Sequence, residues 1–157
     1  MNPQMAEAFR RIPYGIYVLT TQSGAESSAM IVSWVTQVSY SPPLLMVALR
    51  HNRPALPAIR ESSTFSLSLL SRDQKSLVDD LKKLPSQLQP SDLFRQSNQK
   101  GPPIIQQAFA TWECHLFSHV EAGDHILLIA EVRSSTVKPE GKPLTTADYG
   151  KTYIGQS

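Results

Sequence analysis

Runs of apolar residues in the first half of the chain predict three strands. Residues 16–21 and 30–39 are rich in β-branched and aromatic side chains, and the loop 22–28 between them, with Gly24, is typical of a hairpin turn. A break at Ser41-Pro42-Pro43 precedes residues 44–49, which are apolar at all six positions. A short run without polar positions predicts a strand that is buried on both faces.

The second half of the chain adds further strands. Residues 65–69 alternate between apolar residues and serine, which predicts a strand with one solvent-exposed face. Residues 109–120 place Trp112, Cys114 and Leu116 on a face that should be buried, and Gly123-Asp124 predicts the turn to a returning strand at 125–132. Six or more short strands with few helices predict a mainly β fold, an antiparallel barrel.

Spacing and capping signals predict three short helices. They cover residues 4–11, residues 54–61 with Asn52 or Arg53 at the cap, and a segment that a Ser71–Gln74 capping box opens. The third helix has an apolar face and ends at Pro85; that face consists of Leu77, Val78, Leu81 and Leu84.

Two segments carry little periodicity. Residues 85–103 contain four prolines, so we expect a long loop with one turn of helix near Asp92. A loop of that length in a compact domain is often functional, as a lid or as an arm that contacts a partner. In the C-terminal tail, Tyr149 and Tyr153 are expected to dock onto the rest of the chain.

Composition bounds the class of protein. A chain of 157 residues, 41% hydrophobic and 18% charged, predicts one globular domain over residues 1–157. The net charge of +2, without a basic block, argues against a nucleic-acid partner. The lone Cys114 cannot form an internal disulfide, which favours a reducing, cytoplasmic setting. The chain shows no signal-peptide pattern and no apolar run of about 18 residues that would span a membrane.

A polar cluster follows the apolar run at 44–49 and is a candidate phosphate site. The glycine-rich nucleotide fingerprints GxGxxG and GxxxxGK[ST] are both absent, so side chains and loop amides would have to hold a phosphate. Arg50 and Arg53 supply guanidinium groups suited to phosphate oxygens, and a helix beginning near Pro54 would add a favourable partial charge. The alternative is that residues 50–53 form an ordinary solvated turn.

A second candidate is the segment 33–36. Hydroxyl groups of Ser33 and Thr36 and backbone N–H groups near Trp34 and Val35 could bind a polar, ring-containing ligand. The alternative is that Trp34 is a core or interface aromatic residue between ordinary strand residues.

The sequence offers little support for metal or nucleophilic chemistry. On a strand, His115 and His119 would lie about 13 Å apart, too far to share one ion. Neither His51 nor His125 has a cysteine or carboxylate at ligand spacing. Cys114 is expected to be a small core residue and not a nucleophile.

Several separated strings together resemble a known family. They are IPYGIYVLTT at 12–21, AMIVSWVTQVSYSPPL at 29–44, FSLSLL at 65–70, GPPII at 101–105, ATWEC at 110–114 and GDHILLIAEV at 123–132. The pattern resembles the flavin reductase-like, FMN-binding split-barrel family, and its SWVTQVS form is most similar to the flavoredoxin-like members. Ala130 and the Met30-Ile31 pair depart from the family's usual residues.

The resemblance implies a split β-barrel with Greek-key-like connections and a set of site residues. In this chain the implied flavin-binding residues are Ser33, Trp34, Val35, Thr36, Ala48, Leu49, Arg50, His51, Asn52 and Arg53, and His125 would sit where nicotinamide docks. The implied cofactor is FMN, with FAD as the alternative, and NAD(P)H would be a transient co-substrate. The resemblance further implies a homodimer.

The implied activity is an NAD(P)H-dependent flavin reductase, in which hydride passes from nicotinamide to the flavin and no catalytic side chain is required. A non-catalytic FMN electron carrier that a partner protein reduces is the alternative, and an enzyme similar to the pyridoxamine-phosphate oxidases is a third. A redox protein or a monooxygenase would receive the electrons. The choice between NADH and NADPH stays open, because no ribose-reading acidic residue at Rossmann spacing is present.

Overall fold

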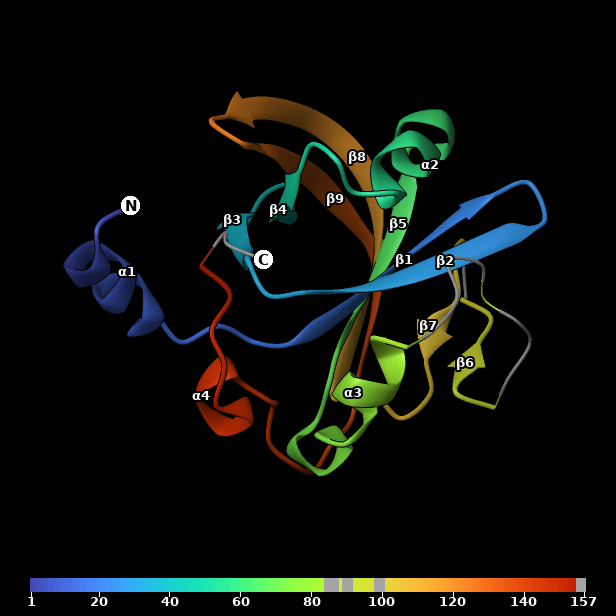
Figure 1. Ribbon diagram of the computed structural model, residues 1–157. Coiled ribbons are helices and arrows are strands. Elements are labelled where there is room, and N and C mark those ends of the chain that lie inside the picture. Colours follow the sequence, from blue (N-terminus) through green and yellow to red (C-terminus); the bar gives the residue numbers. More distant parts are fainter. Residues whose placement is uncertain (84–87, 89–91, 98–100, 155–157) are drawn as a thin grey trace.

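The computed structural model of the protein describes residues 1–83, 88, 92–97 and 101–154 (Figure 1). The strands are β1 (Tyr17–Ser23), β2 (Glu26–Val32), β3 (Val35–Ser39), β4 (Leu44–Arg50), β5 (Thr64–Leu69), β6 (Phe94–Arg95), β7 (Ile104–Ile105), β8 (Ala110–Ala122) and β9 (His125–Val137). The helices are α1 (Pro3–Arg10), α2 (Ala55–Ser62), the 3-10 turn η1 (Arg72–Gln74), α3 (Leu77–Leu81) and α4 (Thr146–Tyr149). No helix within the described ranges combines the length and the apolar character needed to cross a membrane.

Seven strands form one antiparallel sheet in the order β2-β1-β5-β8-β9-β4-β3. The two edge strands, β2 and β3, follow each other in the chain and are joined only by Ser33 and Trp34. The sheet therefore has to curl until its edges approach each other, which makes the barrel that Figure 1 shows. This confirms the predicted mainly β, split-barrel fold.

The same arrangement shows that the prediction of one strand over residues 30–39 was wrong. β2 pairs with β1 at one edge of the sheet, whereas β3 pairs with β4 at the other edge. The chain breaks at Ser33-Trp34 because it changes partner there, and the Trp34 carbonyl already accepts the Ala48 N–H at 3.0 Å. Residues on both sides of this break favour strands, so β propensity alone could not predict it.

The burial of β4 also differs from the prediction. Leu45, Val47 and Leu49 are buried in the core, but the positions between them are only half-buried. The run is apolar throughout, yet only one face of the strand points into the barrel. Ala48 and Arg50 on the other positions are thus left to border a cavity, described below.

The prediction of a solvent-exposed face on β5 was wrong. Ser66 and Ser68 are fully buried. The Ser66 hydroxyl donates to the Pro102 carbonyl at 2.8 Å, and the Ile105 N–H donates to Ser68 Oγ at 3.0 Å. A segment that is distant in sequence covers this face, and the serines satisfy its backbone groups.

The helices follow the capping signals with two differences. α1 and α2 form within a residue of their predicted bounds, although α2 is capped by Pro54 and not by Asn52 or Arg53. The Ser71–Gln74 capping box is present, but it opens a 3-10 turn and then the short α3, not one continuous helix. Leu84 and Pro85, where that helix was predicted to end, lie outside the described residues.

The region predicted as a loop with one helical turn contains a small β ribbon. β6 pairs antiparallel with β7, and residues 92–93 form a turn that is not helical. The remainder of this prediction, at residues 85–87, 89–91 and 98–100, lies outside the described residues.

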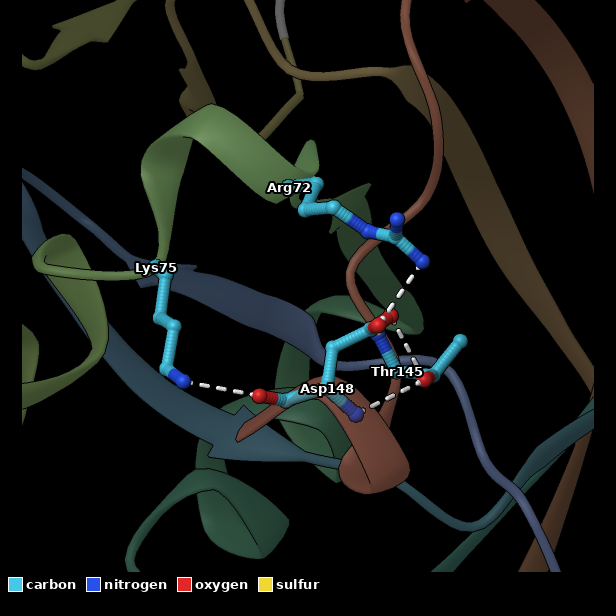
Figure 2. A network of polar contacts seen from close by, with 4 residues as sticks. All are labelled: Arg72, Lys75, Thr145 and Asp148. Carbon is cyan, nitrogen blue, oxygen red and sulfur yellow. Dashed lines mark hydrogen bonds and ion pairs between the residues drawn. The ribbon is translucent and has the colours of Figure 1, made fainter. Parts of the chain in front are cut away.

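A polar network fixes the start of α4 against the segment after β5 (Figure 2). The Asp148 carboxylate forms an ion pair with Arg72 at 2.7 Å and accepts the Thr145 hydroxyl at 2.8 Å, while Lys75 Nζ donates to the Asp148 carbonyl at 2.8 Å. Tyr149 adds a hydrogen bond from its hydroxyl to Asp79 at 2.7 Å. These contacts anchor α4 and so bring the next residues, including Tyr153, to the barrel surface.

Candidate functional site

A cavity of about 580 Å³ opens beside the Ser33-Trp34 link, where the two edges of the sheet approach each other. Its walls come from β2, from the ends of β4 and β9, from the start of α2, from the end of α3 and from the C-terminal tail. The lining residues are Ala29, Met30, Ile31, Val32, Ser33, Trp34, Ala48, Leu49, Arg50, Arg53, Pro54, Leu81, Lys82, His125 and Tyr153. A cavity of this size is typical of a small-molecule or cofactor site.

The wall formed by β2 has a particular character. Residues 29–32 are consecutive and all line the cavity. Because side chains alternate between the two faces of a strand, a consecutive run indicates that the cavity borders the strand's free edge. An edge strand presents backbone N–H and carbonyl groups that have no ladder partner, so this wall can bind the polar rim of a flat ligand.

Three ring-bearing residues form part of the cavity wall. The Trp34 ring lies 4.7 Å from the His125 ring and 5.3 Å from the Tyr153 ring, between centroids. Trp34 Nε1 donates to the Tyr153 carbonyl at 3.3 Å. Residues from three distant parts of the chain therefore form one face on which a planar ring could pack.

His125 is only 4% exposed and is held from one side. Its Nδ1 lies 2.6 Å from Asp124 Oδ1, and Arg50 lies 3.5 Å from the other oxygen of the same carboxylate. The hydrogen bond from His125 is the main cause that lowers the pKa of Asp124, and the Arg50 charge acts in the same direction. His125 Nε2 and Tyr153 Oη are buried and have no hydrogen-bond partner among the described residues.

Cationic groups lie where the apolar run of β4 ends. Arg50 and Arg53 both line the cavity, and the Arg53 N–H donates to the Arg50 carbonyl at 3.1 Å in the intervening turn. Arg50 forms an ion pair with Asp124, whereas Arg53 has no ion-pair partner in the described part of the chain. Arg53 directly precedes Pro54 and α2, and no side chain caps that helix. An anionic group at this point would meet the Arg53 guanidinium and the start of a helix.

The structure brings together seven of the residues predicted from the sequence. Ser33, Trp34, Ala48, Leu49, Arg50, Arg53 and His125 all line the cavity. Val35 packs against the core instead, and Thr36, His51 and Asn52 are exposed. His51 makes its contacts outside the cavity, with the Gly123 carbonyl at 3.3 Å and Glu121 at 3.4 Å.

Other lining residues were not among the predicted site residues. Tyr153 was expected to dock onto the rest of the chain, and its ring does pack against Trp34. Lys82 also lines the cavity, but nothing in the sequence marked it as a site residue beyond its place near a helix end. The residues 29–31 of β2 line the cavity through the position of the edge strand, and no residue pattern marks that position.

The described residues give little support to a metal site or to a nucleophilic cysteine. They contain no group of three or more His, Cys, Asp or Glu side chains that could hold a metal ion. Cys114 is buried in the core, as predicted, and this burial raises the pKa of its thiol to about 12, with a further contribution from the Glu113 charge. Such a thiol remains protonated and unreactive at neutral pH.

Comparison with known proteins gives a consistent result. The profile of the family described as "Flavin reductase like domain" matches residues 9–155. The putative diflavin flavoprotein A 2 of Synechocystis sp. (strain ATCC 27184 / PCC 6803 / Kazusa) is 30% identical over 143 residues, which cover 87% of this chain and 24% of that protein. The chain thus spans about a quarter of the length of the diflavin flavoproteins that it matches.

Solved structures show the same fold. The styrene monooxygenase flavin reductase SMOB from Pseudomonas putida S12 is 30% identical, with a TM-score of 0.76 over 92% of this chain and 91% of that one. The NADH:FAD oxidoreductase SgcE6 of Streptomyces globisporus C-1027, solved in complex with NAD and FAD fragments, is 26% identical. Its TM-score is 0.81, over 90% of this chain and 86% of that one.

Proposed function

We propose that this chain, which belongs to the flavin reductase-like family, binds FMN in the cavity beside Trp34 and reduces it with NAD(P)H. The observation that supports this most directly is the composition of the cavity, which is lined by the rings of Trp34 and Tyr153, by two arginines and by the edge of β2. FAD is the alternative flavin, because the FAD fragment in SgcE6 belongs to a relative of the same fold.

The residues present fit a flavin. The isoalloxazine ring system is flat and largely apolar, with a polar pyrimidine rim that the free edge of β2 can bind through backbone groups. The phosphate of FMN carries about two negative charges, and Arg53 offers a guanidinium without an acidic partner among the described residues. Of the predicted binding residues, we keep Ser33, Trp34, Ala48, Leu49, Arg50 and Arg53, and assign no direct contact to Thr36, His51 or Asn52 within one copy of the chain.

The chemistry of the reaction belongs to the cofactor: when bound, the flavin accepts hydride from reduced nicotinamide and passes electrons onward. The protein's part is to hold two rings in contact and to exclude water. Trp34 and Tyr153 form the apolar wall for this purpose, and His125 lies against the same wall.

We further propose that the protein is a homodimer. α1 stands apart from the barrel in Figure 1 and buries only Ala6, while Met5, Phe9 and Ile12 are 50%, 46% and 41% exposed. A helix of eight residues is marginal in water without packing, so a second copy of the chain is proposed to cover this face. Sedimentation equilibrium tests this, since a purely monomeric protein would contradict it.

A non-catalytic FMN electron carrier is the second candidate. The match to about a quarter of each diflavin flavoprotein favours it, because a domain of that size in a larger protein can receive electrons from its neighbours. A redox protein or a monooxygenase remains the proposed electron acceptor, and a cytoplasmic location remains a prediction from the lone cysteine.

One experiment separates these candidates. The purified protein is scanned for flavin absorbance bands, and NADH or NADPH oxidation is then followed at increasing FMN, FAD or riboflavin. Rapid oxidation supports the reductase, and the better nicotinamide donor and flavin follow from the same data. Tight FMN retention with negligible oxidation supports the carrier, while neither bands nor oxidation with any flavin would refute both.

A further inference from the structure

Lys82 places a positive charge at the rim of the cavity, where the end of α3 borders it. Its side chain is 49% exposed, and its ammonium is held from α3 and from α4. Lys82 Nζ lies 2.6 Å from Tyr149 Oη and 3.5 Å from Asp79 Oδ1, and the Tyr149 hydroxyl donates to that same carboxylate oxygen at 2.7 Å. Because an ammonium group can only donate, the hydrogen bonds run from Lys82 to Tyr149 and from Tyr149 to Asp79.

This arrangement keeps Lys82 charged and limits its movement. The hydrogen bond with Tyr149 is the main cause that raises the pKa of Lys82, and Asp79 acts in the same direction. Tyr149 belongs to α4, which Asp148 and Arg72 anchor to the segment after β5 (Figure 2). An ammonium group that is already fixed loses less conformational entropy when a ligand binds than a freely rotating lysine would.

The cationic residues of the cavity lie on both sides of β2. Met30 packs against the core cluster that contains the buried residues of α2. The next residue, Ile31, packs against the other core cluster, which contains the buried residues of α3. Figure 1 shows the same arrangement, with α2 on one side of β2 and α3 on the other. Because Arg53 precedes α2 and Lys82 follows α3, the two charges flank this strand edge from opposite sides.

The single phosphate of FMN leaves one of these charges to another ligand. If Arg53 binds that phosphate on the α2 side, FMN has no second phosphate for Lys82. The hydride donor has to lie against the flavin ring, so it enters the same cavity, and it is a dinucleotide with phosphate groups of its own. A lysine ammonium binds phosphate as a point charge, which suits a group at a solvent-exposed rim.

We propose that Lys82 binds a phosphate group of the nicotinamide dinucleotide, on the opposite side of β2 from the flavin phosphate, and that Tyr149 is the positioning residue that fixes the Lys82 ammonium. This rests on the proposed function. The phosphate is either the diphosphate, which NADH and NADPH share, or the 2′-phosphate, which NADPH alone carries, and the experiment distinguishes the two. Asp79 weakens this site, because its carboxylate competes with the phosphate for the same ammonium.

The test compares three hydride donors with the FMN-loaded protein: NADPH, NADH and 1-benzyl-1,4-dihydronicotinamide, which has no phosphate. We expect Lys82→Gln to raise KM about fivefold for NADPH alone or for both dinucleotides, and to leave kcat/KM for the benzyl compound unchanged. A rise with NADPH alone assigns the 2′-phosphate, and equal rises assign the diphosphate. Lys82→Arg keeps the charge and should restore most of the loss. Lys83→Gln removes the same charge from an exposed neighbour outside the cavity, so it is the matched control and should change no donor.

The neighbours of Lys82 give effects of defined sign. Asp79→Asn should lower the KM of the affected dinucleotide about twofold, because the competing carboxylate is lost, whereas the exposed Asp80→Asn should leave it unchanged. Tyr149→Phe should raise that KM about twofold at constant kcat. In the Lys82→Gln background Tyr149→Phe should have no further effect on KM, since it acts only through the ammonium group.

A second readout is independent of activity. Isothermal titration calorimetry with NADP⁺ and NAD⁺ measures dinucleotide binding to the flavin-free and to the FMN-loaded protein. We expect Lys82→Gln to raise the dissociation constant of the affected dinucleotide by the same factor as its KM. The dissociation constants of FMN and FAD, measured in parallel, should stay within about twofold of the wild type.

Four outcomes would overturn the proposal or part of it. Unchanged KM and unchanged dinucleotide affinity in Lys82→Gln refute the phosphate contact, and an equal loss with the benzyl compound shows that Lys82 acts on the fold. Weaker FAD binding with unchanged NADPH and NADH values places Lys82 in the flavin site and refutes its role toward the donor. A further loss on adding Tyr149→Phe to Lys82→Gln refutes the positioning role of Tyr149. A wild type that oxidises none of the three donors with any flavin refutes the proposed function, while calorimetry still decides whether Lys82 binds a dinucleotide phosphate.

Discussion

The sharpest prediction concerns the charge that holds the flavin phosphate. Arg53 lines the cavity, is half-buried and has no ion-pair partner among the described residues, whereas Arg50 already contacts Asp124 at 3.5 Å. A phosphate therefore gains more from Arg53, since its guanidinium does not first have to leave a carboxylate. We expect Arg53→Ala to weaken FMN binding more than Arg50→Ala does.

The expected size follows from the kind of bond that is lost. A hydrogen bond to a charged group contributes about 1.5–3 kcal/mol, which corresponds to an increase of about 10- to 150-fold in the FMN dissociation constant. Riboflavin has no phosphate, so Arg53→Ala should leave its dissociation constant within about twofold. The effect on FMN should also shrink as the salt concentration rises, because the phosphate contact is electrostatic.

Flavin fluorescence quenching measures the dissociation constants of FMN and of riboflavin, each in its own titration. Arg60→Ala is the matched control, since Arg60 lies on α2 but is exposed and outside the cavity. Equal losses of FMN and riboflavin affinity in Arg53→Ala would show that the side chain acts on the fold and not on phosphate. Unchanged FMN affinity in both Arg50→Ala and Arg53→Ala would refute a phosphate site at this turn.

Four further predictions concern the site and the fold. His125→Ala is expected to lower the rate of NADH oxidation and leave FMN affinity nearly unchanged in fluorescence titration; equal losses would mean a structural role. Ser68→Ala should lower the free energy of unfolding in urea by about 1–3 kcal/mol, because it leaves the buried Ile105 N–H unpaired, while the exposed Ser76→Ala stays within about 0.5 kcal/mol. Burial raises the pKa of the Cys114 thiol from its ordinary value of 9.0 to about 12. The stability that the neutral, buried thiol contributes is therefore complete below pH 9 and is lost as the pH rises toward 12. Labelling of Cys114 by iodoacetamide at about pH 8 should be slow until urea unfolds the chain. The Thr145 hydrogen bond and the Arg72 ion pair lower the pKa of Asp148, so Asp148→Asn should reduce the urea midpoint at pH 7, and the difference should disappear as the pH falls below the ordinary value of 3.8; a constant difference would contradict this.

Local pattern was sufficient for much of the barrel and for part of the candidate site. Side-chain alternation and β propensity identified β1, β4, β5, β8 and β9, since both reflect the geometry of the strand itself. The polar turn at Arg50–Arg53 could be singled out because it ends an apolar run and because phosphate favours guanidinium groups. The structure places both arginines and His125 on one cavity, and their roles there remain predictions.

Other features depended on partners that lie far away in the chain. Ser66 and Ser68 were predicted to face solvent, since nothing local announces that the backbone at residues 101–105 would cover them. The strand break at Ser33-Trp34 follows from which strands form the two edges of the sheet, and Tyr153 meets Trp34 across 119 positions of sequence. By itself, then, the sequence determined which segments are strands and which residue types could bind an anion. Only the tertiary structure decided which faces are buried and which side chains share a cavity, because both depend on contacts between segments whose separation no local periodicity records.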